Sequence, residues 1–163
     1  MNAIVAVDAN WAIGCQGDLL FSLPTDMRRF RSLTLGGTVI LGRKTLDSFP
    51  GGKPLPKRHN IVITRNTDLT VEGAQIAPGP EEALALAAGD ENIWVIGGGS
   101  VYTALLSRCE RVYLTRVDQA AEDADTFFPN LDKLPGWEVE HTSETVEENG
   151  LTYRFIDYVN TRL

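Results

Sequence analysis

One carboxylate in this chain stands in surroundings that favour proton transfer. Asp26 follows the mostly apolar segment 19–24 and begins a helix pattern that continues with Met27, Phe30 and Leu33. A carboxyl group in apolar company resists ionisation, so its pKa rises toward the range that is useful for moving a proton. The competing interpretation is a helix cap, since an acid in the first turn gains about 0.3–1 kcal/mol from the helix dipole. The residue type alone leaves both interpretations open.

A run of three glycines, Gly97 to Gly99, follows the apolar segment IWVI and precedes a helix pattern. Glycines let backbone N–H groups approach a phosphate, and a helix N-terminus favours the phosphate charge. The same residues also fit a tight strand-to-helix turn without a ligand. We reject the GxGxxG dinucleotide fingerprint, because Tyr102 occupies the place of its third glycine.

Cationic residues gather at three places in the sequence: Arg43-Lys44, Lys57-Arg58-His59 and Arg65. Each group fits a solvated surface or an anion site, where a guanidinium group grips a carboxylate or phosphate through paired hydrogen bonds. The formal net charge of −7 argues against a general nucleic-acid-binding protein. The cations therefore indicate at most a local anion pocket.

The elements that must position these residues alternate along the chain. Composition and patterning predict strands at 2–7, 38–42, 60–64, 75–77, 93–96 and 111–118, helices at 24–34, 43–48, 81–88 and 100–106, and loops at 8–23 and 49–57. Two longer strands, 137–147 and 151–160, meet at a hairpin turn. This order predicts an α/β fold in a single domain, 1–163, with flanking helices and a mostly parallel central sheet that ends in a C-terminal antiparallel hairpin. Ligands bind such sheets beyond the carboxyl ends of the strands.

The composition is that of an ordinary globular protein. The chain has 163 residues, 43% of them hydrophobic and 23% charged. No apolar run approaches the roughly 18–20 residues of a membrane span, and the N-terminus does not resemble a signal peptide, so we expect a cytoplasmic protein that does not bind membranes. Cys15 and Cys109 show no metal spacing, nor do His59 and His141, and we expect no metal site.

Taken together, the motifs resemble the dihydrofolate reductase family in its bacterial chromosomal form. The resemblance rests on ordered segments over nearly the whole chain: WAIGCQGDLLFSLPTDMRRFR, VILGRKTLDSFP, PLPKRHNIVITR, WVIGGGSVY, VYLTRVD and DADTFFP. It implies NADPH-dependent reduction of 7,8-dihydrofolate to tetrahydrofolate, with hydride transfer to the pterin. It also implies a monomer that binds a small-molecule substrate and antifolate inhibitors.

The resemblance assigns the catalytic role to three residues. Asp26 matches the ionisable side chain that promotes protonation of the pterin, Thr115 matches its hydrogen-bonding partner, and Phe21 stands in the loop before the catalytic helix. The substrate residues implied are Val5, Ala6, Leu19, Asp26, Met27, Phe30, Phe49, Leu55, Arg58, Ile96, Tyr102 and Thr115. Among these, Arg58 matches the arginine that binds the glutamate carboxylate of folate. Helical spacing places Asp26, Met27 and Phe30 on one face, while Arg28, Arg29 and Arg31 are expected to point outward.

The resemblance also implies a cofactor site. Its residues are Ala6, Ile13, Gly14, Leu19, Gly42, Arg43, Lys44, Thr45, Thr64, Arg65, Ile96, Gly97, Gly98, Gly99, Ser100, Val101, Tyr102 and Thr126. Arg65 is the candidate partner of the adenosine 2′-phosphate, which distinguishes NADPH from NADH. Gly97 and Gly98 match a pair whose peptide bond is cis in the family.

The chain departs from the family pattern at two places. It has Leu20-Phe21 where Pro-Trp is common, so the indole N–H that could anchor a water is absent, and Leu46 replaces a commonly aromatic residue. The segment 10–20 is expected to act as a lid over the nicotinamide, steadied by Asp125. Trp94 and Trp137 are expected in the core.

Two other functions fit part of the pattern. One is the related reductase of riboflavin biosynthesis, which the LPTDMRRFR segment and Arg58 disfavour because they suit a pterin with a carboxylate tail. The other is a catalytically silent pterin- or nucleotide-binding protein, which the presence of Asp26 and Thr115 disfavours.

Overall fold

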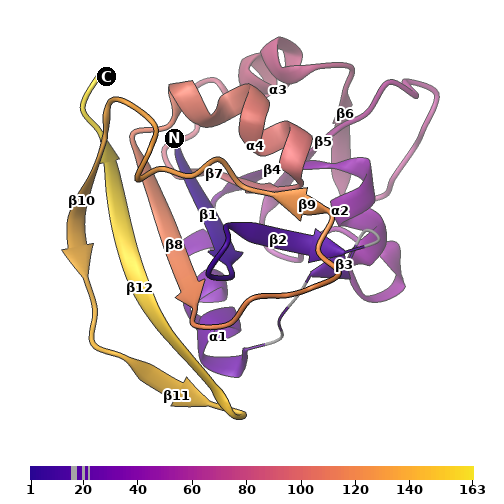
Figure 1. Cartoon of the computed structure of the whole chain (residues 1–163). Helices are drawn as coiled ribbons and strands as arrows, with labels where there is room; N and C mark the ends of the chain where they lie inside the picture. The colour runs from indigo at the N-terminus through magenta and orange to yellow at the C-terminus, as the bar shows by residue number, and fades with distance from the viewer. Residues whose placement is uncertain (16–17, 20, 22) are drawn as a thin grey trace.

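The computed structural model describes residues 1–15, 18–19, 21 and 23–163, and at 15, 18 and 19 it describes the backbone. The central sheet has the strand order β10-β12-β8-β1-β7-β4-β5-β6, with β11 paired to β12 (Figure 1). The parallel strands are β1 (Asn2–Val7), β4 (Thr38–Gly42), β5 (His59–Ile63), β6 (Ala74–Ala77), β7 (Ile93–Gly97) and β8 (Arg111–Val117). The antiparallel strands are β10 (Trp137–Thr142), β11 (Val146–Glu148) and β12 (Leu151–Asn160). The predicted α/β fold, with its parallel sheet and antiparallel C-terminal hairpin, is confirmed.

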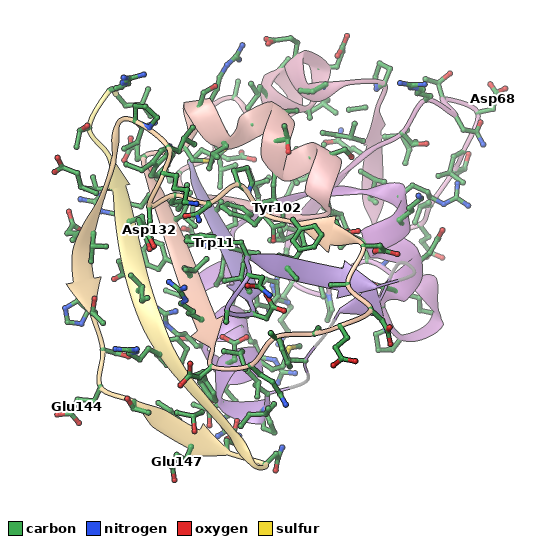
Figure 2. The ribbon with its side chains drawn as sticks, viewed as in Figure 1. Trp11, Asp68, Tyr102, Asp132, Glu144 and Glu147 are labelled. Atoms are coloured by element: carbon green, nitrogen blue, oxygen red, sulfur yellow. The ribbon has the colours of Figure 1, made fainter. Side chains whose placement is uncertain are left out.

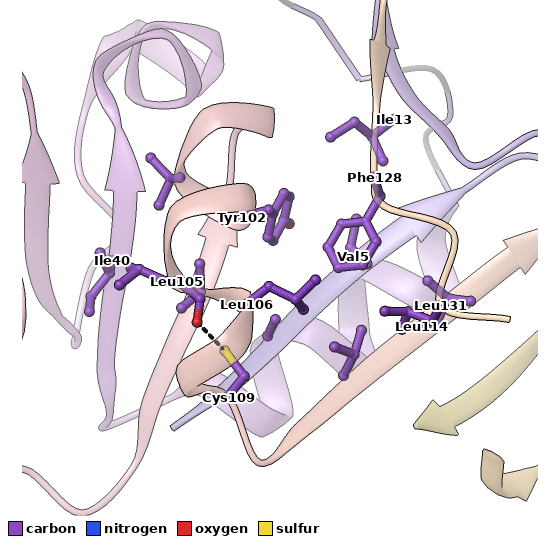
Figure 3. Packing of buried hydrophobic residues seen from close by; sticks show 14 of the residues in the cluster. Val5, Ile13, Ile40, Tyr102, Leu105, Leu106, Cys109, Leu114, Phe128 and Leu131 are labelled. Carbon is purple, nitrogen blue, oxygen red and sulfur yellow. Dashed lines mark hydrogen bonds between the residues drawn. The ribbon is translucent and has the colours of Figure 1, made fainter. Parts of the chain in front are cut away.

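The parallel strands are apolar on both faces because helices cover both. Along β1, Ala3, Val5 and Val7 pack into one core, while Ile4 packs into the other. The first core includes side chains of α3 (Pro80–Ala87) and α4 (Gly99–Leu105), and Figure 3 shows its packing around Tyr102 and Phe128. The second includes side chains of α1 (Pro24–Thr34) and α2 (Arg43–Ser48). The sheet therefore holds α1, α2 and α4 at fixed places around its carboxyl edge.

The core residues behave as their types predict. Trp94 is buried in the second core, and Trp137 is partly buried against the first. The Cys109 thiol donates to the carbonyl oxygen of Leu105 at 3.5 Å (Figure 3), and burial raises its pKa to about 12. Among the described residues, no helix is long and apolar enough to cross a membrane.

A second, small sheet covers the carboxyl edge of the first. It has the order β3-β2-β9 and joins β2 (Ala12–Cys15) to β3 (Asp18–Leu19) and β9 (Thr126–Phe127). The predicted loop at 8–23 is wrong in this part, because strands this short form through pairing with a segment more than a hundred residues away. The predicted contact of the segment 10–20 with Asp125 is present as a backbone hydrogen bond, from the N–H of Asp125 to the carbonyl oxygen of Gly14 at 3.0 Å.

Three other predictions need correction. The predicted strand 137–147 is interrupted between β10 and β11, where Ser143 Oγ accepts the N–H of Phe155 in place of a backbone carbonyl. The loop 49–57 contains a short 3₁₀ turn, Pro50–Gly52. Arg29 does not point outward. Its guanidinium lies 4.2 Å from the ring centre of Phe155 and 3.3 Å from a carboxylate oxygen of Asp157, because α1 packs against β12.

A fully buried carboxylate connects the two sheets. Asp8 follows β1, and its Oδ1 accepts the backbone N–H groups of Asn10 and Ala12 at 2.8 and 2.9 Å. Its Oδ2 accepts the N–H of Ala121 at 2.8 Å. One side chain thus fixes the segment that leads into β2 and the segment that leads toward β9.

We expect Asp8→Ala to lower the free energy of unfolding by about 3–5 kcal/mol, because three N–H groups lose their acceptor and each such loss costs about 1–3 kcal/mol. Asp8→Asn, which keeps one acceptor oxygen, should lose less. Denaturant unfolding measures both. Asp68→Ala is the matched control, since Asp68 is exposed and points away from the molecule (Figure 2). Equal stability of Asp8→Ala and Asp68→Ala would contradict the role given to Asp8.

Candidate functional site

A cleft of about 220 Å³ opens where β1, β7, α1, α2 and α4 meet. Most of the predicted site residues line it together: Val5, Ala6, Ile13, Gly14, Phe21, Asp26, Met27, Phe30, Lys44, Thr45, Phe49, Ile96, Gly97, Gly98, Gly99, Tyr102 and Thr126. They come from both sheets and from three helices. The cleft thus lies at the edge of the sheet where ligands were expected.

Asp26 lies in the first turn of α1 and is hydrogen-bonded to a residue of β8. The Thr115 hydroxyl donates to Asp26 Oδ1 at 2.6 Å, and Thr115 itself is 1% exposed. The hydrogen bond shows that the carboxylate is held by the sheet as well as by its own helix. The predicted pairing of Asp26 with Thr115 is confirmed.

The surroundings of Asp26 favour its protonated form. Burial raises the pKa of the Asp26 carboxyl above its ordinary value, and the negative charge of Glu148 adds to the rise. The hydrogen bond from Thr115 and the positive charge of Arg29 act in the opposite direction without cancelling the effect of burial. Asp26 is the carboxylate among the described residues that line the cleft, and its pKa is raised.

The glycine run forms one wall of the cleft. The Gly97-Gly98 peptide bond is cis, as the resemblance implies, and Gly97 has φ +128°, where an L side chain is strained. A Cβ added to either glycine would lie 3.3 Å from Thr45 Oγ1. Backbone atoms without side chains therefore line the cleft at this wall, next to the hydroxyl of Thr45. Tyr102 is buried beside the wall and donates its hydroxyl to the carbonyl oxygen of Ile4 at 2.6 Å.

Arg58 lies at the C-terminal end of α1. Its Nε donates to Thr34 Oγ1 at 2.9 Å and its Nη1 to the carbonyl oxygen of Pro56 at 2.7 Å. Thr34 ends α1 eight positions after Asp26, so the residue that holds Arg58 lies about 12 Å along the helix from Asp26. Burial and then the charge of Arg31 lower the pKa of Arg58, but a guanidinium group stays cationic in proteins. A ligand that reaches from Asp26 to Arg58 would run along the face of α1 that carries Phe30.

Several predicted residues do not line the cleft as the structure describes it. Two of them lie at the start of α2: Gly42 precedes the helix, and Arg43 forms an ion pair with Asp47 at 3.2 Å. Leu55 is half-buried against the second core. The others are Ser100 and Val101, which belong to α4, and Thr64 and Arg65, which follow β5. The predictions for Leu20 and for the side chain of Leu19 lie outside the described residues. Leu46 is 2% exposed in the second core, where the residue common in the family would be aromatic.

Sequence reasoning missed two residues of the cleft wall, Ile4 and Ser48. Strand alternation places Ile4 on the same face of β1 as Ala6, and helical spacing places Ser48 three residues after Thr45. Both signals were present in the sequence.

Comparisons with known proteins agree on one family. The family model described as dihydrofolate reductase matches residues 1–160. A dihydrofolate reductase of Neisseria meningitidis serogroup A is 39% identical over 156 residues, which cover 96% of this chain and 95% of the relative. That of Bacillus subtilis is 36% identical over 157 residues, with 95% and 91% covered. A solved dihydrofolate reductase from Enterococcus faecalis, complexed with NADP(H) and RAB-propyl, superposes with a TM-score of 0.86 at 35% identity and covers 97% of this chain and 94% of that chain.

Proposed function

The chain belongs to the dihydrofolate reductase family, and from this premise we propose that it reduces 7,8-dihydrofolate to tetrahydrofolate with NADPH, using Asp26 to promote protonation of the pterin. The observation that supports the proposal most directly is the hydrogen bond from the Thr115 hydroxyl to the Asp26 carboxylate at the wall of a largely apolar cleft. A carboxyl group in this position can bond the edge of a pterin and share a proton with it.

Different residues of the cleft have different roles in the proposed reaction. Met27, Phe30 and Phe49 give the cleft apolar walls, which favour a flat ring and restrict water around it. Asp26, with its raised pKa, holds a proton near neutral pH more readily than an exposed aspartate does. Thr115 fixes the orientation of the carboxylate. The proton then reaches the ring nitrogen through water, and Phe21 bounds the space which that water enters.

The residues beside the glycine wall fit a dinucleotide. Gly97 and Gly98 line the cleft without side chains, which allows a ligand to approach their backbone. Lys44 and Thr45 offer a cation and a hydroxyl to phosphate groups, and Arg43 and Arg65 lie further along the same edge of the sheet. When bound, NADPH supplies the hydride that reduces the pterin.

We expect Arg65→Ala to weaken NADPH binding about tenfold and to leave NADH binding unchanged, because a charge-assisted bond contributes about 1.5–3 kcal/mol and NADH lacks the 2′-phosphate. Titration of both cofactors by fluorescence or calorimetry measures the two dissociation constants. Lys53→Ala is the control for loss of an exposed cation, since Lys53 is also on the surface. An equal loss for NADH and NADPH would remove Arg65 from the 2′-phosphate site.

The proposal is tested by following NADPH oxidation after addition of dihydrofolate, with tetrahydrofolate identified as the product. Turnover with dihydrofolate, and none with the aminopyrimidine substrate of the riboflavin pathway, is the expected result. Tight binding of NADPH without turnover would instead make the protein a silent nucleotide-binding protein. The family match favours neither alternative. We also expect antifolates to compete with dihydrofolate for the cleft.

A further inference from the structure

The tip of the C-terminal hairpin contacts the start of the catalytic helix. Glu148 ends β11, and its Oε1 accepts the backbone N–H of Thr25 at 3.0 Å while its Oε2 accepts the Thr25 hydroxyl at 2.5 Å. The hydroxyl of Tyr153 on β12 donates to Oε1 at 3.1 Å, and Arg28 Nη2 donates to Thr25 Oγ1 at 3.0 Å. Residues 123 positions apart in the sequence thus form one polar cluster at the N-terminus of α1.

The helix needs an acceptor at this place. Leu23 occupies the N-cap position, and its side chain cannot accept a hydrogen bond. Pro24 has no N–H, so the N–H of Thr25 is the first donor that the helix leaves without an internal partner. A carboxylate near a helix N-terminus is also favoured by the helix dipole. Glu148 therefore caps α1 from a distant hairpin, in place of the usual capping residue.

This cap lies one residue from the reacting group. Thr25 directly precedes Asp26, which is bonded on its other side to Thr115 of β8. The strands β8 and β12 pair through Thr115 and Phe155, so the hairpin and the sheet hold the first turn of α1 from two sides. Leu23, which directly precedes α1, belongs to the same buried apolar cluster as Tyr153 of β12.

We propose that Glu148 is a positioning residue for the reaction: by capping Thr25 it holds Asp26 in the orientation in which Thr115 and the substrate meet it. This role rests on the proposed function of Asp26. It concerns a residue outside the cleft wall, and its effect on the reaction passes through Thr25.

The titratable groups that face Asp26 come from several elements. Arg29 is on α1 itself, Glu148 on β11, Tyr153 on β12 and Tyr102 on α4. The bonds from the Thr25 side chain and backbone lower the pKa of Glu148, so this residue is anionic near neutral pH. Its charge raises the pKa of Asp26. Loss of the charge should therefore move the ionisation of Asp26 toward lower pH.

Two substitutions separate the cap from the charge. Glu148→Gln keeps an oxygen for the N–H of Thr25 and removes the charge, whereas Glu148→Ala removes both. The matched control is Glu147→Gln, because Glu147 precedes Glu148 on the same strand, is exposed and points away from the molecule (Figure 2). The measurements are the pH profile of the hydride-transfer rate in a single turnover and the titration of the Asp26 carboxyl by NMR without ligands.

We expect both Glu148 variants to shift the midpoint of the pH–rate profile and of the Asp26 titration toward lower pH. Glu148→Ala should also slow hydride transfer about tenfold at neutral pH, because without the cap the first turn of α1 no longer holds Asp26 in one orientation. Glu147→Gln should match the wild type in both measurements. A lower melting temperature with an unchanged pH profile and unchanged Asp26 titration would reduce Glu148 to a structural cap and overturn the proposal. Failure of the wild type to oxidise NADPH would refute the proposed function, whereas the NMR titration would still decide the coupling between Glu148 and Asp26.

Discussion

Asp26→Asn is expected to lower turnover roughly 100-fold at neutral pH, because a positioned acid–base group contributes about 10²–10⁴-fold to a proton-transfer step. The amide keeps an oxygen for the Thr115 hydroxyl, so the geometry of the first turn of α1 is preserved. It cannot hold or exchange the proton. Steady-state NADPH oxidation at saturating dihydrofolate measures the loss, and Asp68→Asn provides the same chemical change on the exposed surface.

Part of this loss should return in acid. As the pH falls, more of the substrate arrives already protonated, and the reaction no longer depends on Asp26. The ratio of wild-type to variant turnover should therefore decrease with decreasing pH. A modest ratio that stays constant with pH would show that Asp26 serves only as an acid in the first turn of a helix.

The stability of the same variant separates a chemical effect from misfolding. Because the pKa of Asp26 is raised in the folded state, ionisation of this group opposes folding at every pH above its unfolded-state value of 3.8. Below that pH both states are protonated and the effect vanishes. Asp26→Asn should thus be at least as stable as the wild type at neutral pH, although it is much less active.

Arg58→Leu is expected to raise the KM for dihydrofolate about 100-fold and to change kcat little, because two charge-assisted bonds to the carboxylate tail contribute about 1.5–3 kcal/mol each before their desolvation cost. The dissociation constant for NADPH should not change. Arg58→Lys should give an intermediate KM, since an ammonium group cannot make the paired contact of a guanidinium group.

Arg31→Leu is the matched control, because Arg31 is an exposed cation whose charge reaches Arg58. It should leave the KM nearly unchanged. The bond from Arg58 to Thr34 is lost in Arg58→Leu, so the melting temperature of each variant is needed to choose an assay temperature at which all are folded. An unchanged KM in folded Arg58→Leu would exclude this arginine from substrate binding.

The parts of the fold that follow from local patterns were predictable. The parallel strands are continuous apolar runs, and α1 has a proline at its start and a regular apolar face, so their bounds agree with prediction within one or two residues. The strands β2 and β9 were not predictable, because each is short and they pair with one another across more than a hundred residues of sequence. Arg29 resembled a surface cation, and only the packing of α1 on Phe155 brings it inward.

In the candidate site, too, residues with a local sequence signal were predictable and residues placed by distant contacts were not. Asp26 stands out in the sequence by its apolar neighbours, and the resemblance to the family supplies Thr115 as its partner. Asp8 had a weak signal, an acid at the end of an apolar strand followed by Asn10, which is typical of a side-chain turn. Glu148 had none, because no local pattern connects a hairpin turn to a helix 123 residues earlier. Contacts of this kind become visible only in the folded chain.

The central claim is that Asp26 couples protonation of the substrate to its reduction, and one measurement tests it most directly. The rate of NADPH oxidation in a single turnover is followed against pH for the wild type and for Asp26→Asn. We predict that the wild-type rate depends on an ionisation with a pKa above the ordinary range of an aspartate, and that this ionisation is absent from the variant. The same midpoint in both proteins would contradict the claim.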